Sequence, residues 1–268
     1  TILITGASTG IGRAAVELFQ EKGWNVVATM RTPENETELN QLDNVLVTRL
    51  DVTDRSSIAE AVAAGAERFG GIDALVNNAG YGAFGPLEAT STDSIERQFD
   101  TNVIGLLDVT REVLPHFRAQ GSGVVVNISS VGGRMTLPLG SLYHGTKYAV
   151  EGISEALTYE LNPLGISVKI VQPGAIETDF AGRSIDFSND ESLPEYQGMV
   201  AHVGGLFESF MANASPPSLV AEVNHAAVTD GSDHMRYIPG EDAKALLAAR
   251  DSQDDATFMA GIKAQLGM

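Results

Sequence analysis

The stretch Thr1-Ile-Leu-Ile-Thr-Gly-Ala-Ser-Thr-Gly-Ile-Gly12 decides the fold that we predict for this chain. An apolar, β-branched run leads into a turn with glycines at positions 6, 10 and 12, and a helical pattern follows. Glycine lets a backbone turn sharply and come close to another group. A turn between a strand and a helix also offers free N–H groups, and the helix dipole favours an anion there. The stretch therefore predicts a phosphate-binding loop.

Apolar, β-branched runs recur along the chain and alternate with helical patterns. After the first strand at 1–5, strands are predicted at 25–30, 45–50, 72–77, 124–129, 166–172 and 235–238. Helices are predicted at 11–22, 34–42, 54–69, 93–118, 144–163, 218–229, 241–249 and 254–266. Most of the strands are continuously apolar, as expected where both faces are covered. We therefore predict an α/β fold over a single domain, 1–268, with a doubly wound, seven-stranded, mostly parallel sheet of Rossmann type and helices on both faces.

The composition excludes several classes of function. The chain has 268 residues, with 35 acidic against 17 basic side chains and a formal net charge of -18, so a groove for a nucleic-acid backbone is not expected. It has no cysteine, and its histidines never recur at helical spacing, so no metal site is predicted. No apolar run reaches the roughly 18–20 residues of a membrane span, and no signal peptide is evident. We expect a cytoplasmic protein without a membrane partner.

Several further motifs follow the glycine turn in a fixed order. They are Thr5-Gly6-x3-Gly10-Ile11-Gly12, Asn77-Asn78-Ala79-Gly80, Ser130, Tyr143-x3-Lys147 and Pro173-Gly174 with Thr178. In this combination the sequence resembles the compact, single-domain branch of the short-chain dehydrogenase/reductase family over about residues 1–180. The segment 235–240 and the acidic tail after it resemble the hydroxysteroid and retinol dehydrogenase-like members. The resemblance implies a nicotinamide-dependent oxidoreductase acting on a carbonyl or alcohol.

Tyr143 and Lys147 lie at i and i+4, on one face of a predicted helix. A cation near a phenol favours the phenolate, so we expect a lowered pKa for Tyr143 and a role as acid or base. The resemblance implies that Ser130 orients the substrate oxygen and that Lys147 also holds the nicotinamide ribose. It adds Asn102 as a fourth catalytic residue, which holds a water that links Lys147 to solvent. Ser129 is the rival hydroxyl, but thirteen residues before the tyrosine is the family's spacing, and this selects Ser130.

The end of the second strand bears on the choice of cofactor. An acid about 20 residues after the glycine turn would bind a free ribose 2′-hydroxyl, but the chain has Arg31 there. Arg31 can pair with a 2′-phosphate, and Arg13 is expected to assist it. We therefore predict NADP(H) rather than NAD(H); the alternative is that Arg31 is a solvated loop residue. The resemblance implies these cofactor-binding residues: Gly6, Ser8, Thr9, Gly10, Ile11, Gly12, Asp51, Val52, Asn78, Ala79, Gly80, Tyr143, Lys147, Pro173, Gly174, Ile176 and Thr178.

Structural alternatives stay open for two of these residues. Asp51 could be a helix cap or turn acid, and Asn102 could be a buried or capping asparagine. Three aromatic residues near the motifs, His116, His144 and Tyr148, match no functional position of the family. We interpret them as packing or surface residues.

The segment 179–215 carries many adaptable apolar side chains. We predict a mobile or partly helical insertion that closes as a lid over a bulky apolar ketone or alcohol; the alternative is that these side chains only pack the segment onto the domain. A catalytically silent dinucleotide sensor or scaffold protein of the same fold is the alternative function. Apolar residues on the helices 93–118 and 144–163 exceed what solvent exposure needs, so a homodimer or homotetramer is expected.

Overall fold

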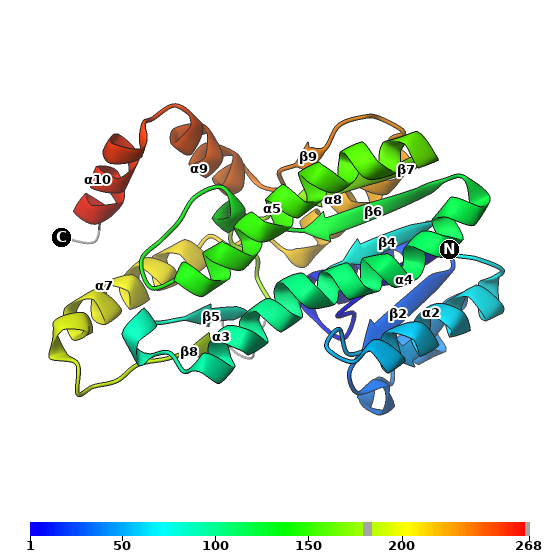
Figure 1. Cartoon of the computed structure of the whole chain (residues 1–268), viewed down its shortest axis with the longest axis horizontal. Coiled ribbons are helices and arrows are strands. Elements are labelled where there is room, and N and C mark those ends of the chain that lie inside the picture. The colour runs from blue at the N-terminus through cyan, green and yellow to red at the C-terminus, as the bar shows by residue number, and fades with distance from the viewer. Residues whose placement is uncertain (179–183, 266–268) are drawn as a thin grey trace.

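A parallel sheet of seven strands forms the centre of the computed structural model, which describes residues 1–178 and 184–265. Every strand pair in it is parallel, and the order is β3-β2-β1-β4-β6-β7-β9. All carboxyl ends therefore lie at one edge, on the left in Figure 1. The predicted fold class is confirmed. The strands are β1 (Ile2–Ile4), β2 (Val26–Met30), β3 (Val45–Arg49), β4 (Ala74–Asn77), β6 (Gly123–Ile128), β7 (Ile166–Val171) and β9 (Arg236–Tyr237).

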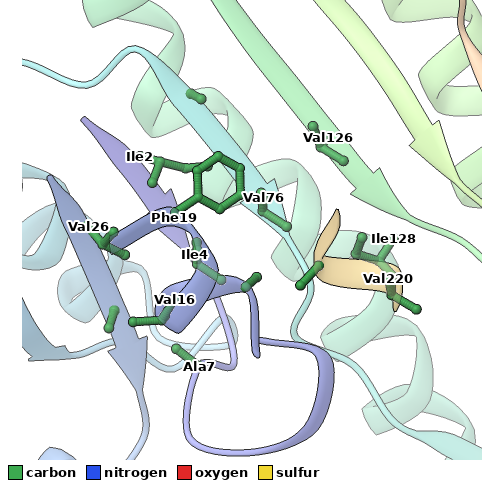
Figure 2. Packing of buried hydrophobic residues seen from close by; sticks show 14 of the residues in the cluster. Ile2, Ile4, Ala7, Val16, Phe19, Val26, Val76, Val126, Ile128 and Val220 are labelled. Atoms are coloured by element: carbon green, nitrogen blue, oxygen red, sulfur yellow. The ribbon is translucent and has the colours of Figure 1, made fainter. Parts of the chain in front are cut away.

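Helices cover both faces of the sheet. One face packs against α1 (Gly10–Glu21) and α8 (Pro217–Thr229), and the other against α2 (Arg55–Phe69), α4 (Gly105–Gln120) and α5 (Ser141–Leu161). On the first face the fully buried ring of Phe19 lies among apolar side chains of β1, β2 and β4, as Figure 2 shows. Burying a ring of this size stabilises the fold by roughly 1.5–3 kcal/mol. The strands are apolar on both faces because both faces are covered.

The helix predicted at 54–69 corresponds to α2, which has a well-defined beginning and end. The Asp54 side chain caps α2 by accepting hydrogen bonds from the backbone N–H groups of Ser56 and Ser57. At the other end Gly70 adopts a left-handed conformation with φ of 82° and ends the helix. Such an N-cap contributes about 1 kcal/mol.

The prediction of a helix at 34–42 is wrong. Two 3₁₀ turns stand there instead, η1 (Pro33–Asn35) and η2 (Leu39–Gln41). Between them, the Glu36 side chain accepts hydrogen bonds from the backbone N–H groups of Glu38 (2.8 Å) and Leu39 (2.9 Å). A side chain that captures N–H groups in this way competes with helical hydrogen bonding.

The helix predicted at 93–118 is interrupted. It consists of α3 (Thr92–Phe99), a π-helical turn η4 (Asp100–Ile104) and α4. The π turn carries Asn102, whose side chain is buried. π-helical turns are rare and often mark functional sites, and here the turn aims an amide inward at the strand edge.

Several short elements were not predicted from the sequence. A small parallel sheet pairs β5 (Gly82–Phe84) with β8 (Ile185–Phe187), and three short 3₁₀ turns, η3 (Leu87–Ala89), η5 (Val131–Gly133) and η6 (Asn162–Leu164), connect longer elements. Of the predicted insertion, 179–183 lies outside the described residues. The rest contains β8 and the helix α7 (Pro194–Met211), which extends away from the sheet in Figure 1.

The C-terminal helices α9 (Glu241–Asp251) and α10 (Asp255–Gln265) lie near the start of α5 (Figure 1). Ala243 and Leu247 of α9 pack on Val131 and Met135, which belong to the segment between β6 and α5. The C-terminal part of the chain therefore covers a segment that begins beside the strand edge. None of the helices within 1–178 and 184–265 is long and apolar enough to span a membrane.

Candidate active site

The predicted site residues gather at the carboxyl edge of the sheet. Each set follows a different strand: the glycine turn follows β1, Arg31 follows β2, Asp51 follows β3, and Asn78 follows β4. Ser130 follows β6, and the segment 173–178 follows β7. Since these strands are parallel neighbours, their ends form one continuous rim. In open α/β sheets such a rim, at the point where strand order reverses, is where ligands bind.

The glycine turn has the backbone conformation that its sequence predicts. Gly6 and Gly10 have positive φ of 66° and 56°. A Cβ atom on Gly12 would lie 2.3 Å from the carbonyl oxygen of Gly6, so only glycine fits at the start of α1. Thr178 lies against Gly10, where a Cβ would approach its Cγ2 atom to 3.0 Å. This bare backbone at a helix N-terminus fits the pyrophosphate of a dinucleotide.

Asn78 and Thr5 fasten the end of β4 to the turn. The Asn78 Nδ2 atom donates to the carbonyl oxygens of Thr5 (2.9 Å) and Gly6 (3.1 Å). In return, the Thr5 hydroxyl oxygen accepts from the backbone N–H groups of Asn78 and Ala79, both at 3.0 Å. These bonds fix the shape of the turn without occupying its outward-facing N–H groups. Asn78 therefore shapes the predicted cofactor cleft.

The two arginines considered for a 2′-phosphate have different surroundings. Arg31 is exposed immediately after β2. Arg13 is held by three carboxylates: Glu17 (3.1 Å), Glu36 (2.9 Å) and Glu38. A phosphate would have to compete with these carboxylates for the Arg13 guanidinium. The expected assistance from Arg13 is therefore not supported by the geometry, and Arg31 stands alone in the predicted role.

Asp51 makes a turn, as the structural alternative anticipated. Its Oδ1 atom accepts hydrogen bonds from the backbone N–H (3.0 Å) and the hydroxyl (2.8 Å) of Thr53. Val52 packs on the beginning of α4, where a Cβ on Gly105 would lie 2.7 Å from the Val52 Cβ. A hollow of about 550 Å³ opens beside Val52. The turn role of Asp51 leaves its predicted contact with an adenine compatible with the geometry.

Ser130 and Tyr143 meet beyond β6. The Ser130 hydroxyl oxygen accepts from the backbone N–H of Gly132 at 3.0 Å, and its hydroxyl lies 3.5 Å from the Pro173 carbonyl oxygen. The side chains of Ser130 and Tyr143 share a hydrogen bond. The tyrosine ring is packed against Phe84 of β5, with ring centroids 5.2 Å apart. The segment after β6 and the start of α5 thus meet at the phenol of Tyr143, as the resemblance implied.

The pKa of Tyr143 shifts in the direction opposite to the one expected. Burial raises it, and the hydrogen bond with Ser130 counteracts only part of that effect. The expectation of a lowered pKa considered only the neighbouring lysine and left out the loss of solvation. The phenol of the isolated protein is therefore protonated at neutral pH.

Lys147 lies on the same helix face as Tyr143, as predicted. Its ammonium is 5.9 Å from the centroid of the tyrosine ring and donates a hydrogen bond to the Ile128 carbonyl oxygen at 2.8 Å. Burial lowers the pKa of Lys147 to about 8, and the charge of Glu151 acts against this shift. Glu151 is itself buried and bound to Arg236 at 3.0 Å. The lysine therefore titrates close to neutral pH.

Asn102 clamps the segment that follows Asn78-Ala79-Gly80. Its Nδ2 atom donates to the Tyr81 carbonyl oxygen (2.8 Å) and to the Thr146 hydroxyl (3.2 Å), while its Oδ1 atom accepts from the Tyr81 N–H (3.1 Å). A Cβ on Gly80 would come within 3.1 Å of Oδ1. The Asn102 side chain is therefore buried and hydrogen-bonded, as the alternative of a buried asparagine anticipated. Through Thr146 it also links the β4 loop to the helix that carries Tyr143 and Lys147.

Asp242 of α9, in the C-terminal part of the chain, holds the segment 173–178 that follows β7. The Asp242 carboxylate accepts from the Ala175 N–H at 3.0 Å, and a Cβ on Gly174 would lie 2.1 Å from one of its oxygens. Ile176 is buried and forms a bridge with Ser215. Pro173 contributes its carbonyl oxygen to the Ser130 neighbourhood. The four predicted residues of this segment therefore border the same rim as the glycine turn.

Three residues near the site were not singled out as functional from the sequence: His144, Asp242 and Glu151. His144 was interpreted as a packing residue, Asp242 belongs to α9, which carries no recognisable motif, and Glu151 lies on α5 beyond the Tyr143-x3-Lys147 motif. Asp242 and Glu151 contact segments far along the chain. His144 contacts the loop that precedes α5, and the sequence does not reveal the shape of that loop. Only the adjacency of His144 to Tyr143 could have drawn attention to it.

Comparison with known proteins agrees with this architecture. The family model described as short chain dehydrogenase matches residues 1–188. An uncharacterized oxidoreductase of Schizosaccharomyces pombe is 44% identical over 89% of this chain and 100% of its own length. Human 17-beta-hydroxysteroid dehydrogenase type 1 is 32% identical over 93% of this chain and 80% of its own. A crystal structure of a short-chain dehydrogenase from Streptomyces avermitilis is 34% identical, with a TM-score of 0.85, covering 100% of this chain and 97% of the other.

The fold and the site define a dinucleotide-dependent oxidoreductase of the Rossmann type. The chain belongs to the short-chain dehydrogenase/reductase family, as the family model and the relatives show. The resemblance seen in the sequence motifs is confirmed. The chemistry of this family is the interconversion of carbonyl and alcohol groups with a nicotinamide dinucleotide.

The shifted pKa of Lys147 predicts how stability depends on pH. Below about pH 8 the lysine is charged in both states, and its buried ammonium lowers the free energy of unfolding. Between about 8 and its ordinary value of 10.5, the folded protein has released a proton that the unfolded chain keeps, so stability rises with pH. Relative to Lys147→Met, the wild type should gain about 2 kcal/mol between pH 7.5 and 9.5 in urea unfolding. A difference independent of pH would show that Lys147 titrates normally.

Proposed function

We propose that this protein is an NADP(H)-dependent oxidoreductase that interconverts a ketone or aldehyde and an alcohol on a fairly apolar substrate, with Tyr143 as the acid and base. The observation that carries the proposal is the buried Tyr143 phenol, bonded to Ser130 and flanked by the Lys147 ammonium at 5.9 Å from its ring. A phenol in this setting can exchange a proton with an oxygen held by Ser130.

The chain's own residues orient the substrate oxygen and move its proton. NADP(H), when bound, supplies or accepts the hydride. In reduction, Tyr143 is protonated at neutral pH and donates its proton to the carbonyl oxygen, which the Ser130 hydroxyl orients. In oxidation, the phenolate accepts the proton of the alcohol, and the Lys147 ammonium stabilises that negative charge. Asn102 acts by holding the β4 loop and, through Thr146, the helix α5 in register.

The residues that would hold the dinucleotide border the rim from β1 to β7. The backbone of 6–12 would hold the pyrophosphate, while Asp51 and Val52 would frame the adenine. Asn78, Ala79 and Gly80 would line the cleft beside Tyr143 and Lys147. The segment with Pro173, Gly174, Ile176 and Thr178 would contact the nicotinamide end.

The preference for NADP(H) rests on Arg31. It is exposed at the end of β2, where an acid would otherwise bind a ribose 2′-hydroxyl. Its guanidinium can form two parallel hydrogen bonds with a 2′-phosphate.

An apolar substrate is favoured by α7 and by the comparisons. The apolar side chains of this helix recur at helical spacing, and each is only partly buried: Tyr196, Met199, Val200, Val203, Leu206, Phe207, Phe210 and Met211. A half-covered apolar helix face suits a bulky apolar ligand. One relative at 32% identity is named for a hydroxysteroid, which is such a molecule. We propose that 179–215 covers the substrate.

The remaining expectations follow the same proposal. The chain 1–268 would act as one domain, in the cytoplasm, as a homodimer or homotetramer. Its partner is a small carbonyl or alcohol. A catalytically silent dinucleotide sensor is disfavoured because Asn102, Ser130, Tyr143 and Lys147 are all present and are brought to one rim.

Tyr143→Phe is expected to abolish turnover and leave the cofactor bound. With NADPH and a panel of alicyclic and aromatic ketones, the wild type should oxidise NADPH, with less turnover of an acetoacetyl thioester. The variant lacks the acid and should lose at least about 100-fold in kcat, the lower end of acid–base contributions. Its Kd for NADPH, from nicotinamide fluorescence, should change less than about twofold.

Tyr159→Phe is a matched control, since it removes the hydroxyl of a phenol that is 78% exposed on α5 and belongs to no part of the proposed site. Retained turnover in Tyr143→Phe would refute the assignment of the acid. Bound NADPH without turnover of any carbonyl by the wild type would support the sensor instead.

Arg31→Ala is expected to change the cofactor preference. Loss of a charged hydrogen-bond pair should raise the KM for NADPH about 10- to 100-fold and leave the KM for NADH within about twofold. Arg118→Ala, which removes an exposed arginine in the last turn of α4, controls for net charge. Equal effects of Arg31→Ala on both cofactors would contradict a 2′-phosphate contact.

A further inference from the structure

His144 is a buried histidine beside the proposed acid, and none of the steps above uses it. It follows Tyr143 in α5, and only 5% of its surface is exposed. Its ring stands edge-on to the ring of Tyr143, with centroids 5.7 Å apart and an interplanar angle of 65°. The imidazole reaches back into the segment 131–140, which connects Ser130 to α5.

Both ring nitrogens of His144 are bonded, and the bonds determine the tautomer. The backbone N–H of Leu137 donates to Nε2 at 3.0 Å, so Nε2 carries no proton. Nδ1 lies 2.9 Å from the carbonyl oxygen of Gly132 and must therefore carry the proton that it donates. Burial lowers the pKa of His144, with the bond to Gly132 opposing the shift, so the ring is neutral at pH 7.

The backbone at Gly132 and Gly140 packs closely against the imidazole of His144. A Cβ on Gly132 would lie 2.8 Å from Nδ1, and a Cβ on Gly140 would lie 2.6 Å from Cδ2. Leu139, next to Gly140, has a positive φ of 64°, which costs a non-glycine residue of order 1 kcal/mol. A strained turn between two close contacts is maintained only where the surrounding bonds hold it. His144 supplies a bond to Leu137, two residues before this turn, and a bond to Gly132 near the start of the segment.

Gly132 connects His144 to the catalytic serine. Its carbonyl oxygen accepts from His144, and its N–H donates to the Ser130 hydroxyl oxygen at 3.0 Å. Because that oxygen accepts from Gly132, the hydroxyl hydrogen of Ser130 is turned away from the Gly132 N–H, toward the Tyr143 side chain and the Pro173 carbonyl. The direction of the Ser130 O–H bond thus depends on the position of Gly132.

We propose that His144 is a positioning residue for the carbonyl–alcohol reaction: as the Nδ1–H tautomer it holds Gly132, and through Gly132 it sets the direction of the Ser130 hydroxyl toward the substrate oxygen. This inference rests on the proposed function of the site. It assigns His144 no contact with the substrate or the cofactor.

Two substitutions separate the two bonds of His144. In His144→Asn the side-chain amide occupies the place of Nδ1 and can still donate to Gly132, while the bond with Leu137 is lost. In His144→Gln the amide reaches the place of Nε2, keeps the Leu137 bond and loses the Gly132 bond. Each variant loses one bond, so similar losses of Tm are expected. We expect His144→Asn to keep kcat/KM within about threefold and His144→Gln to lose about 10- to 100-fold, as for a misplaced catalytic group.

A Ser130→Ala background tests the connection itself. There the serine hydroxyl is absent, so exchanging His144→Asn for His144→Gln should change kcat/KM less than about twofold. An equal cost of His144→Gln in both backgrounds would overturn the proposal, as would kcat/KM values of the two single variants that simply follow their Tm.

Amide hydrogen exchange of Gly132 gives a readout that needs no turnover. The N–H of Gly132 is bonded to Ser130, so its exchange should be faster in His144→Gln and unchanged in His144→Asn. Equal exchange in both variants would overturn the positioning role. Absence of turnover in the wild type would instead count against the proposed function, and the exchange result would still decide the role of His144.

Discussion

The junction between Thr5, Gly6 and Asn78 is the constraint on which the rest of the site depends. Asn78 donates to the carbonyl oxygens of Thr5 and Gly6, and the Thr5 hydroxyl accepts from two N–H groups that follow β4. Because the strands are parallel, every segment with a functional side chain leaves the sheet at this rim. The junction keeps the glycine turn against the end of β4. Asn102 acts in a similar way on the loop after β4, because its side-chain amide bonds to both the N–H and the carbonyl oxygen of Tyr81.

Loss of solvation governs the charges at this rim. It raises the pKa of Tyr143 and lowers that of Lys147, so both groups shift toward their neutral forms in the isolated protein. The net charge of -18 has little bearing here, because the Debye length is about 8 Å at physiological salt. The N-terminus of α1 and Arg31 border the rim where the phosphates are proposed to bind. The acidity of the chain is thus a property of its surface.

The local signals of the sequence predicted most of the fold. Glycine spacing located the turn, and strand-like runs, most of them continuously apolar, placed all seven strands. Prediction failed at 34–42, where the Glu36 side chain binds nearby backbone N–H groups and two turns replace a helix. It also failed where a contact from outside the segment decides, since the small sheet of β5 and β8 pairs segments about a hundred residues apart. The π turn at Asn102 and the two bonds of His144 likewise depend on distant partners. The pKa of Tyr143 depends on burial, which a spacing of four residues does not report.

The central claim is that the bare backbone at this rim binds a nicotinamide dinucleotide. Titration of Gly12→Ala with NADPH, followed by nicotinamide fluorescence, tests it most directly. A Cβ at residue 12 would lie 2.3 Å from the Gly6 carbonyl oxygen and must displace the turn. Gly152→Ala, on an open face of α5, is the matched control. We expect a Kd at least about tenfold weaker for Gly12→Ala, with unchanged far-UV circular dichroism, and an unchanged Kd for Gly152→Ala. An unchanged Kd for Gly12→Ala would contradict it.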